Sequence, residues 1–414
     1  MLGCPVATAS AVDPPNDDDN ETAITEDPDE IGNQIEGVIE AREEGNSHGP
    51  LLSPFFNEWG QFWLNVDEAS GFNIGFAYTT VYLAATNGTY AAGRSGGSGD
   101  LDIFGRWFVF NRDNNQGLIG EGTLAFNTEY RHRIGDVTPG DLGNSIGSLW
   151  PLTFGFNEQD ISIIELWWQQ HFADDQFIFR IGKIDVSNLY DAYGFNSANY
   201  FYQNNAFSSN PAIPFPSNGP AIALEWNPTD ELFLIAGVAD GEGVKTETFS
   251  SSFLDVDSWF VPATFGWNPE LAGLGRGLYQ ITAWHSEERN DSNSPSANGF
   301  SVVAQQELSN GWVPFVRYAR SSAAATPTRQ LITAGAVLER PFNRRDDRLA
   351  FAVGWGQPHD RENLRDQWVA EVFYRYAYAT EIQISPHIQL IVDPSANPDT
   401  DVIGIFGLRT RINF

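Results

Sequence analysis

The chain has 414 residues and a formal charge of −31, because 54 acidic residues outnumber 23 basic ones. So acidic a protein repels phosphate groups, which argues against nucleic-acid binding. Cys4 is the only cysteine, so the sequence excludes a disulfide framework and a cysteine-rich metal centre. No run of 18 apolar residues occurs, which excludes a membrane-spanning helix. A β-barrel stays possible, because its apolar residues alternate with polar ones.

The first 50 residues are expected to form a leader and an arm. For Met1–Val12 three interpretations stay open: a signal-peptide remnant that ends among small residues, a lipoprotein signal ending in Leu2-Gly3-Cys4, or a leader with neither role. Residues 13–44 carry 13 acidic residues against Arg42 alone, and prolines interrupt them. Such a stretch repels itself and buries little apolar surface, so the sequence predicts a disordered acidic arm.

Residues 51–71 are expected to form a short amphipathic helix before the main domain. Aromatic and aliphatic residues recur there at spacings of three and four, from Phe55 to Val66, which places them on one helical face. Gly71 marks the predicted end of this helix. After Gly71 the apolar period changes from that of a helix to that of a strand.

Residues 72–414 alternate between apolar and polar positions in segments of about ten residues, separated by Gly, Asn, Asp and Pro. In 367–378, for example, Trp368, Val372 and Tyr376 share one face while Glu371 and Arg375 share the other. The predicted strands are 72–84, 99–110, 119–133, 159–172, 176–183, 219–227, 232–240, 258–267, 278–287, 299–308, 312–321, 330–339, 348–356, 367–378, 382–393 and 402–414. We therefore expect an all-β, sixteen-stranded antiparallel barrel.

The lengths of the connections favour a transmembrane barrel. With sixteen strands, most long connections, such as 134–158 and 184–218, fall on one rim, and short turns such as 173–175 fall on the other. Outer-membrane barrels show this asymmetry, with long external loops and short periplasmic turns.

The alternating pattern alone fits two arrangements, a soluble β-protein with its apolar faces inside and a membrane barrel with its apolar faces outside. Aromatic residues near strand ends, as at Tyr374, Tyr376 and Tyr378, suit the lipid headgroup level. Opposite charges share the polar face, as with Glu371 and Arg375. The chain also ends in phenylalanine, as many outer-membrane barrels do. We therefore predict that the apolar face points to lipid.

Residues 182–241 resemble the carbohydrate-selective porin family (OprB type). The resemblance rests on Gly182-Lys183-Ile184-Asp185, on the stretch from Asn210 to Pro220 and on Ala236-Gly237-Val238-Ala239-Asp240-Gly241. Similar features occur in 102–107 and 407–414, so the resemblance spans about residues 55–414. It implies a sixteen-stranded outer-membrane channel for facilitated diffusion of sugars, without catalytic residues or a cofactor.

A sugar-selective pore needs groups that replace the water around hydroxyls, and arginine offers five fixed donors. The chain has 21 arginines and only two lysines. Alternation places the candidate pore-lining residues on the polar face: Asp102, Arg106, Glu129, Arg131, Arg133, Glu165, Trp167, Arg180, Glu225, Arg317, Glu371, Arg375, Arg409 and Arg411. Trp167 is the candidate stacking ring. Wall charges also commonly pair with one another and brace a barrel, so this second role stays open.

The connection 184–218 is long and rich in asparagine and aromatic residues. Loops of this length in a compact fold are usually functional. We expect it to fold inward and narrow the channel; an external loop packed on its neighbours is the alternative.

Signals for catalysis and metal binding are weak. Two G-x-S-x-G matches lie in loops without a following helical pattern, and six histidines show no ligand spacing. Asp393, Asp399 and Asp401 are a weak calcium candidate or simply a solvated turn.

The expected partners are small sugars, outer-membrane lipid, the barrel-insertion machinery through Phe414 and, as in many porins, two further copies in a homotrimer. The predicted location is the outer membrane of a Gram-negative bacterium. Three alternatives stay open: a general or anion-preferring porin, a soluble carbohydrate-binding or carbohydrate-cleaving β-protein, and a plugged structural barrel.

Overall fold

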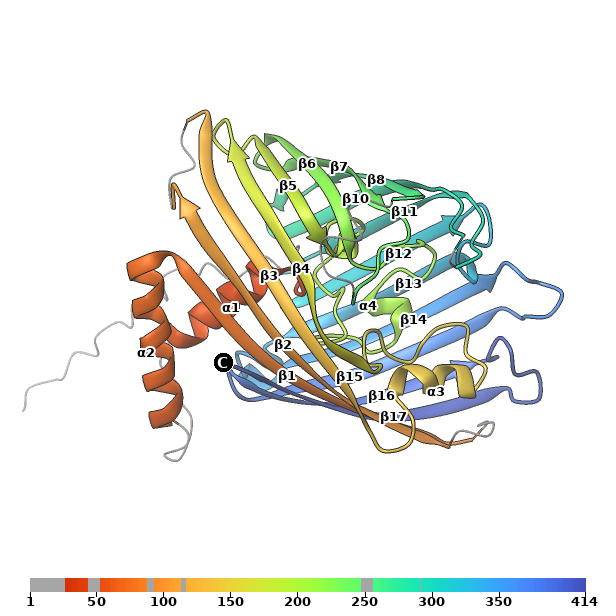
Figure 1. Cartoon of the computed structure of the whole chain (residues 1–414). Helices are drawn as coiled ribbons and strands as arrows, with labels where there is room; N and C mark the ends of the chain where they lie inside the picture. The colour runs from red at the N-terminus through yellow and green to blue at the C-terminus, as the bar shows by residue number, and fades with distance from the viewer. Residues whose placement is uncertain (1–26, 44–52, 88–92, 113–116, 247–255, 291) are drawn as a thin grey trace, which may run out of the picture.

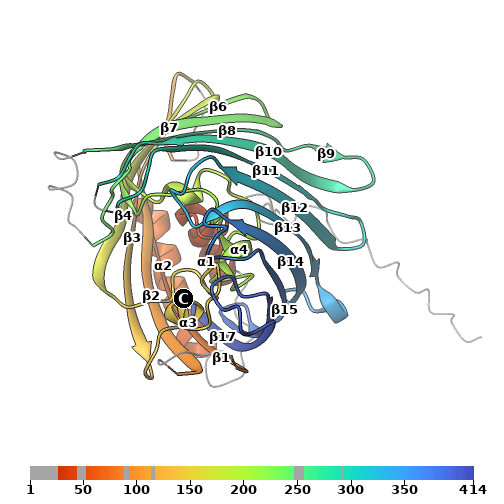
Figure 2. The same cartoon turned by 90° about the vertical axis from the view of Figure 1, so that its right-hand side faces the viewer.

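The computed structural model describes residues 27–43, 53–87, 93–112, 117–246, 256–290 and 292–414. The leader and the first half of the predicted arm lie outside these residues. From Phe72 onward, the described chain forms one antiparallel sheet that closes on itself (Figures 1 and 2). Closure occurs because the first strand pairs with the second along one edge and with the last along the other.

The barrel contains sixteen long strands and one two-residue strand. They are β1 (Phe72–Ala85), β2 (Ser95–Phe110), β3 (Ile119–Ile134), β4 (Gln159–Phe172), β5 (Phe177–Ile184), β6 (Gly219–Thr229), β7 (Leu232–Asp240), β8 (Trp259–Trp267), β9 (Glu270–Leu271), β10 (Gly275–Ser286), β11 (Ala297–Gln306), β12 (Trp312–Ser321), β13 (Thr328–Glu339), β14 (Arg348–Pro358), β15 (Gln367–Ala379), β16 (Ile382–Val392) and β17 (Val402–Asn413). The sixteen predicted strands are confirmed, and the short β9 belongs to the turn between β8 and β10.

The two rims of the barrel differ as the connection lengths predict. One rim, here called the loop rim, carries long connections such as 135–158 and 185–218. These contain the helices α3 (Pro139–Ser145), η1 (Val186–Asn188) and α4 (Asn205–Ser208). The other rim, here called the turn rim, carries shorter connections, one of which holds η2 (Pro341–Asn343). The loop rim is therefore the end of the barrel from which the long connections extend.

Apolar side chains cover the outer wall of the barrel, and charged side chains point inward. On β15, Val372 is 47% exposed in the isolated chain, whereas its neighbour Glu371 is 1% exposed. Trp226, Ile388 and Phe406 are likewise exposed on the outer wall. The alternative of a soluble protein with its apolar faces inside is thereby contradicted.

The predicted helix before the barrel is confirmed as α2 (Ser53–Ser70). It ends where Gly71 adopts a positive φ of 70°, a conformation that glycine takes without strain. The ring of Trp59 lies 5.8 Å from that of Phe76 and 6.2 Å from that of Phe414. Phe414, the predicted contact for the insertion machinery, thus packs beneath α2. Among the described helices, none combines the length and the apolar character required to cross a membrane.

The prediction of a disordered acidic arm is wrong for residues 27–43. They contain the helix α1 (Ile31–Glu43), which lies within the ring of strands near the turn rim (Figure 2). Averaged composition hid the spacing of Ile31, Ile35 and Val38, which are buried together. The barrel also supplies opposite charges, since Arg106 and Arg180 pair with glutamates of this segment. The acidic residues therefore do not repel one another in isolation.

The connection 185–218, here called the inner loop, runs inside the barrel. The guanidinium of Arg409 donates hydrogen bonds of 2.7 Å to the carbonyl oxygens of Ala198, Tyr200 and Phe201. Such carbonyls have no helix or sheet partner, so a five-donor side chain from the wall satisfies them. The structure thus shows the inward course expected for this loop.

Two further inner-wall residues fasten the inner loop. The Glu371 carboxylate accepts hydrogen bonds from the backbone N–H groups of Gln203, at 2.7 Å, and Asn204, at 2.8 Å. The Arg317 guanidinium donates to the carbonyl oxygen of Ala206 at 2.7 Å and lies 3.6 Å from the carboxylate of Asp191. Burial raises the pKa of Asp191, and the charge of Arg317 opposes this rise. The charged side chains of the wall therefore bind the polar backbone of the inner loop.

Aromatic packing completes this attachment. Tyr193, Tyr202 and Phe207 are fully buried, and the ring of Tyr202 lies 5.8 Å from Phe315 and 5.2 Å from Phe373 on the wall. The inner loop consequently fills this side of the lumen.

The apolar outer wall predicts that a charge added in the middle of a strand lowers stability more than a charge added at the turn rim. Replacing Val372 by Arg should lower the free energy of unfolding by about 2–4 kcal/mol if Val372 lies at the bilayer midplane, because the charge enters hydrocarbon. Leu118, which is exposed at the turn rim, is the control, and Leu118→Arg should cost about 0–1 kcal/mol. Urea unfolding of the liposome-inserted protein measures both. Equal costs would contradict the placement of Val372 in lipid.

The contacts between the wall and the inner loop predict that replacing Glu371 has a local effect on this loop. Replacing Glu371 by Ala leaves two buried N–H groups without their acceptor, which costs about 1–3 kcal/mol. Hydrogen exchange at Gln203 and Asn204 should accelerate by about 5- to 150-fold while the barrel stays intact. The control is Glu225→Ala, an inner-face carboxylate on β6, which should leave exchange at these two amides unchanged.

Candidate functional site

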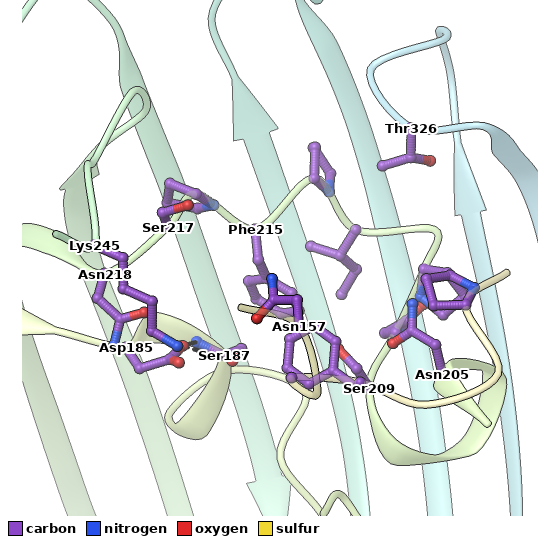
Figure 3. Close-up of a pocket in the computed structure, with 18 of the residues that line it drawn as sticks. Asn157, Asp185, Ser187, Asn205, Ser209, Phe215, Ser217, Asn218, Lys245 and Thr326 are labelled. Carbon is purple, nitrogen blue, oxygen red and sulfur yellow. Dashed lines mark hydrogen bonds between the residues drawn. The ribbon is translucent and has the colours of Figure 1, made fainter. Parts of the chain in front are cut away.

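A cavity of about 810 Å³ lies inside the barrel between the inner loop and the wall formed by β2, β3 and β4. Figure 3 shows Asp185, Asn218 and Lys245 on one side of it, with Asn205 and Ser209 on the other. Residues of several loop-rim connections line it, so it begins among the loops. The cavity is the space that the inner loop leaves free.

Three carboxylates form a cluster in the wall of this cavity. Asp100 and Asp102 project from β2 and Glu129 from β3, and one oxygen of each lies within 4.8 Å of the others. All three are buried. Asp102 and Glu129 are direct partners in the register of β2 and β3, which explains their proximity. We refer to Asp100, Asp102 and Glu129 as the carboxylate cluster.

Two cations neutralise part of the carboxylate cluster. Arg131 contacts Asp100 at 3.3 Å and also pairs with Glu129. Lys245 reaches Glu129 from a loop-rim connection, at 3.0 Å. Within the described residues this is a group of carboxylates close enough to share a metal ion, but Arg131 and Lys245 already supply positive charge there. The arrangement suits recognition of hydroxyl groups, since donors and acceptors alternate along the wall.

Four of the predicted pore-lining residues border the cavity: Asp102, Glu129, Arg131 and Glu165. Asp102 lines the cavity, and within the described residues its Oδ2 atom is buried without a hydrogen-bond partner. Glu165 accepts hydrogen bonds from the indole N–H of Trp167 at 3.1 Å and from the backbone N–H of Asp185 at 3.3 Å.

The predicted stacking ring does not face the cavity. Trp167 is 5% exposed, and the guanidinium of Arg180 lies 4.5 Å from the centre of its ring. Arg180 in turn pairs with Glu30. In this structure the ring is therefore covered, and the large aromatic residues that border the cavity are Trp150, Phe154, Phe156 and Phe215.

The remaining candidates hold other parts of the protein. Arg409, Glu371 and Arg317 fasten the inner loop, as described above. Arg375 lies over the ring of Phe201, and Arg411 lies over that of Tyr200. These five side chains are buried and contact the inner loop.

Three candidates lie elsewhere on the inner face. Arg106 pairs with Glu36 of α1 at 3.0 Å. Arg133 lies at the loop rim, 3.6 Å from Glu158. Glu225 is a partly exposed inner-face residue of β6.

Several lining residues were not predicted. Asp100 lies two positions before Asp102 on the same face and inside the predicted strand 99–110, so the alternation that selected Asp102 could have found it as well. The loop residues Lys245 and Arg289 gave no periodic signal. Burial lowers the pKa of Arg289, while Glu242 and Asp240 raise it.

The inner end of the cavity is formed by the segment before and within α1. Asp29 and Gln34 line it. Asp29 accepts hydrogen bonds from Ser197, at 2.9 Å, and Asn199, at 3.3 Å. The neighbouring Asp27 is buried, and burial together with repulsion by Asp29 raises its pKa. The carboxylates of this segment thus meet the inner loop directly.

Solved structures of other proteins share this architecture. The high-pH structure of Pseudomonas putida OprB superposes with a TM-score of 0.71 at 17% identity, covering 87% of this chain and 98% of that one. A mutant of Rh. blastica porin superposes with a TM-score of 0.51 at 10% identity, covering 83% and 100%. These likenesses concern the fold.

Sequence comparison finds curated relatives as well. Porin AaxA of Chlamydia trachomatis serovar L2 is 21% identical over 248 residues, which is 59% of this chain and 53% of AaxA. The chain thus matches about half the length of these relatives. Residues 61–414 match the carbohydrate-selective porin, OprB family. The chain therefore belongs to the carbohydrate-selective porin family of the OprB type.

Proposed function

We propose that the chain is an outer-membrane channel through which neutral sugars diffuse passively. The observation that carries this proposal is the polar cavity between the inner loop and the wall, inside a barrel whose outer face is apolar. Family membership supports the same function. The barrel fold and the family indicate a channel and not an enzyme.

The lining of the cavity suits sugars. Asp102 and Arg131 offer an acceptor and a donor, and the side chains of Asn157 and Asn205 carry both kinds of group. Such groups replace the water around a hydroxyl while binding weakly enough for the solute to leave. The phenylalanine rings that border the cavity supply apolar surfaces against which the less polar face of a sugar ring can rest. These groups fit a small polyol.

A general pore that prefers cations is the second candidate. Seven acidic residues line the cavity, namely Asp29, Asp100, Asp102, Glu129, Glu165, Asp185 and Asp360, against the three basic residues Arg131, Lys245 and Arg289. Rings of carboxylates favour cations in channels. The anion-preferring alternative loses its support, because most inner-wall arginines bind the inner loop or α1.

The same proposal includes the surroundings of the barrel. We expect the apolar outer wall to contact outer-membrane lipid of a Gram-negative bacterium. Contact of Phe414 with the insertion machinery would precede the packing of α2 on this residue. A homotrimer remains an expectation.

The Asp102 carboxylate in the cavity wall provides a test. We expect Asp102→Asn to weaken the block of single-channel current by glucose about fivefold to tenfold, because a charged acceptor is replaced by a neutral one. In a salt gradient, the reversal potential should also shift toward lower cation preference. The exposed loop residue Asp399 is the control, and Asp399→Asn should change neither quantity.

Liposome swelling separates the candidates. Swelling in glucose together with a glucose-dependent block supports the sugar channel. Swelling without any block supports the general pore. Liposomes that do not swell in any sugar would overturn the channel itself.

A further inference from the structure

The segment Asp27–Glu43 is held across the lumen by contacts with several parts of the wall. Glu30 pairs with Arg180 of β5 at 3.3 Å, and Glu36 pairs with Arg106 of β2 at 3.0 Å. At the turn rim, Arg345 lies 3.4 Å from Glu40. Further hydrogen bonds join Gln34 to Arg411 of β17 and Arg42 to the carbonyl oxygen of Ile74 in β1. The segment therefore spans from the inner loop to the turn rim.

Polar contacts alone would hold this segment weakly. Several of these ion pairs are half-exposed, and such pairs contribute about 0–1 kcal/mol each. A stronger and non-directional contribution is needed to keep a helix in a water-filled barrel.

That contribution comes from an apolar patch on the inner wall. Ala77 of β1, Phe104 of β2, Ala125 of β3 and Trp167 of β4 form one buried cluster with Ile31, Ile35 and Val38 of α1. Phe104 and Ile35 are both completely buried. Inner-wall residues of a water-filled barrel are normally polar, so an apolar patch here requires a cover. The buried face of α1 provides it.

The position of this segment relative to the cavity determines its effect on transport. Asp29 and Gln34 form the inner end of the cavity. The inner loop fills the other side of the lumen, and Asn196 of this loop donates a hydrogen bond of 2.8 Å to Asp27. A solute that leaves the cavity toward the turn rim therefore meets α1. A helix with its side chains is about 10 Å across, which is a large part of a pore.

We propose that Asp27–Glu43 is an internal plug, bound to the apolar patch of the inner wall, that limits the conductance of the channel. This inference rests on the proposed channel function and adds to it the element that sets the width of the pathway. The acidic arm is thus a part of the transport apparatus that the chain carries within itself.

Two lysine substitutions on opposite faces of α1 test this proposal. Ile35→Lys places a charge against Phe104 and Trp167, so it should unseat the helix and raise single-channel conductance by more than about twofold. Gly37→Lys adds the same charge on the exposed face, where a Cβ atom at Gly37 would meet nothing within 4 Å. It should keep the wild-type conductance. Both variants should retain heat-modifiable migration, which shows that the barrel is folded.

A labelling experiment reports the position of the plug independently of transport. In a Cys4→Ser background, Ile31→Cys places a buried thiol on the apolar face of α1. A membrane-impermeant maleimide should label it in the Ile35→Lys variant and not in the Gly37→Lys variant. Deletion of residues 27–43 is a second way of removing the plug, and it should raise conductance similarly.

The outcomes separate the two proposals. The plug is overturned if conductance is unchanged in a variant in which labelling shows release of the helix. It is also overturned if conductance is unchanged after deletion of residues 27–43 in a folded barrel. Conductance that rises equally in Ile35→Lys and Gly37→Lys also overturns it, because the effect would then not depend on the apolar contact. Absence of any conductance in the wild type and in every folded variant would instead overturn the channel function.

Discussion

The need to pair every backbone N–H and C=O group of the strands dominates this structure. A closed antiparallel sheet meets it, since β1 pairs with both β2 and β17 and leaves no free edge. Closure at sixteen strands then leaves an interior too wide for wall side chains to fill. The charged face of each strand points into this interior, and the apolar face forms the outer wall.

The interior charges serve mainly to organise chain segments. Arg409 and Arg317 bind carbonyl oxygens of the inner loop, and Glu371 binds its N–H groups. A loop inside a barrel has backbone groups that neither a helix nor a sheet satisfies, and charged side chains of the wall are strong partners for them. The arginines thus shape the passage indirectly, by determining where the loop lies.

The lumen is consequently divided into three parts. The inner loop fills one side, α1 occupies the region near the turn rim, and the cavity with its carboxylate cluster remains open from the loop rim. This division explains why an arginine-rich sequence produces a cavity with an acidic lining. Arg106 and Arg180 face acidic residues of the arm and do not face the cavity.

The sequence by itself determined the number of strands, the face of each strand that points outward, the rim that carries the long loops and the helix before β1. The strands, their two faces and the helix follow from local periodicity, as at Glu371 and Val372, which is a property of neighbouring residues. The outward face was inferred from aromatic residues near strand ends, shared charges and the final phenylalanine, and the loop rim from the lengths of the connections. Only the tertiary structure decided three features: the ordered conformation of residues 27–43, the covering of Trp167 by Arg180, and the presence of Asp102 instead of Arg375 at the cavity. These features depend on which distant segments meet inside the barrel. The helix α1 is stable because Phe104 and Trp167 offer an apolar surface and two arginines offer counter-charges. No pattern within the arm contains that information.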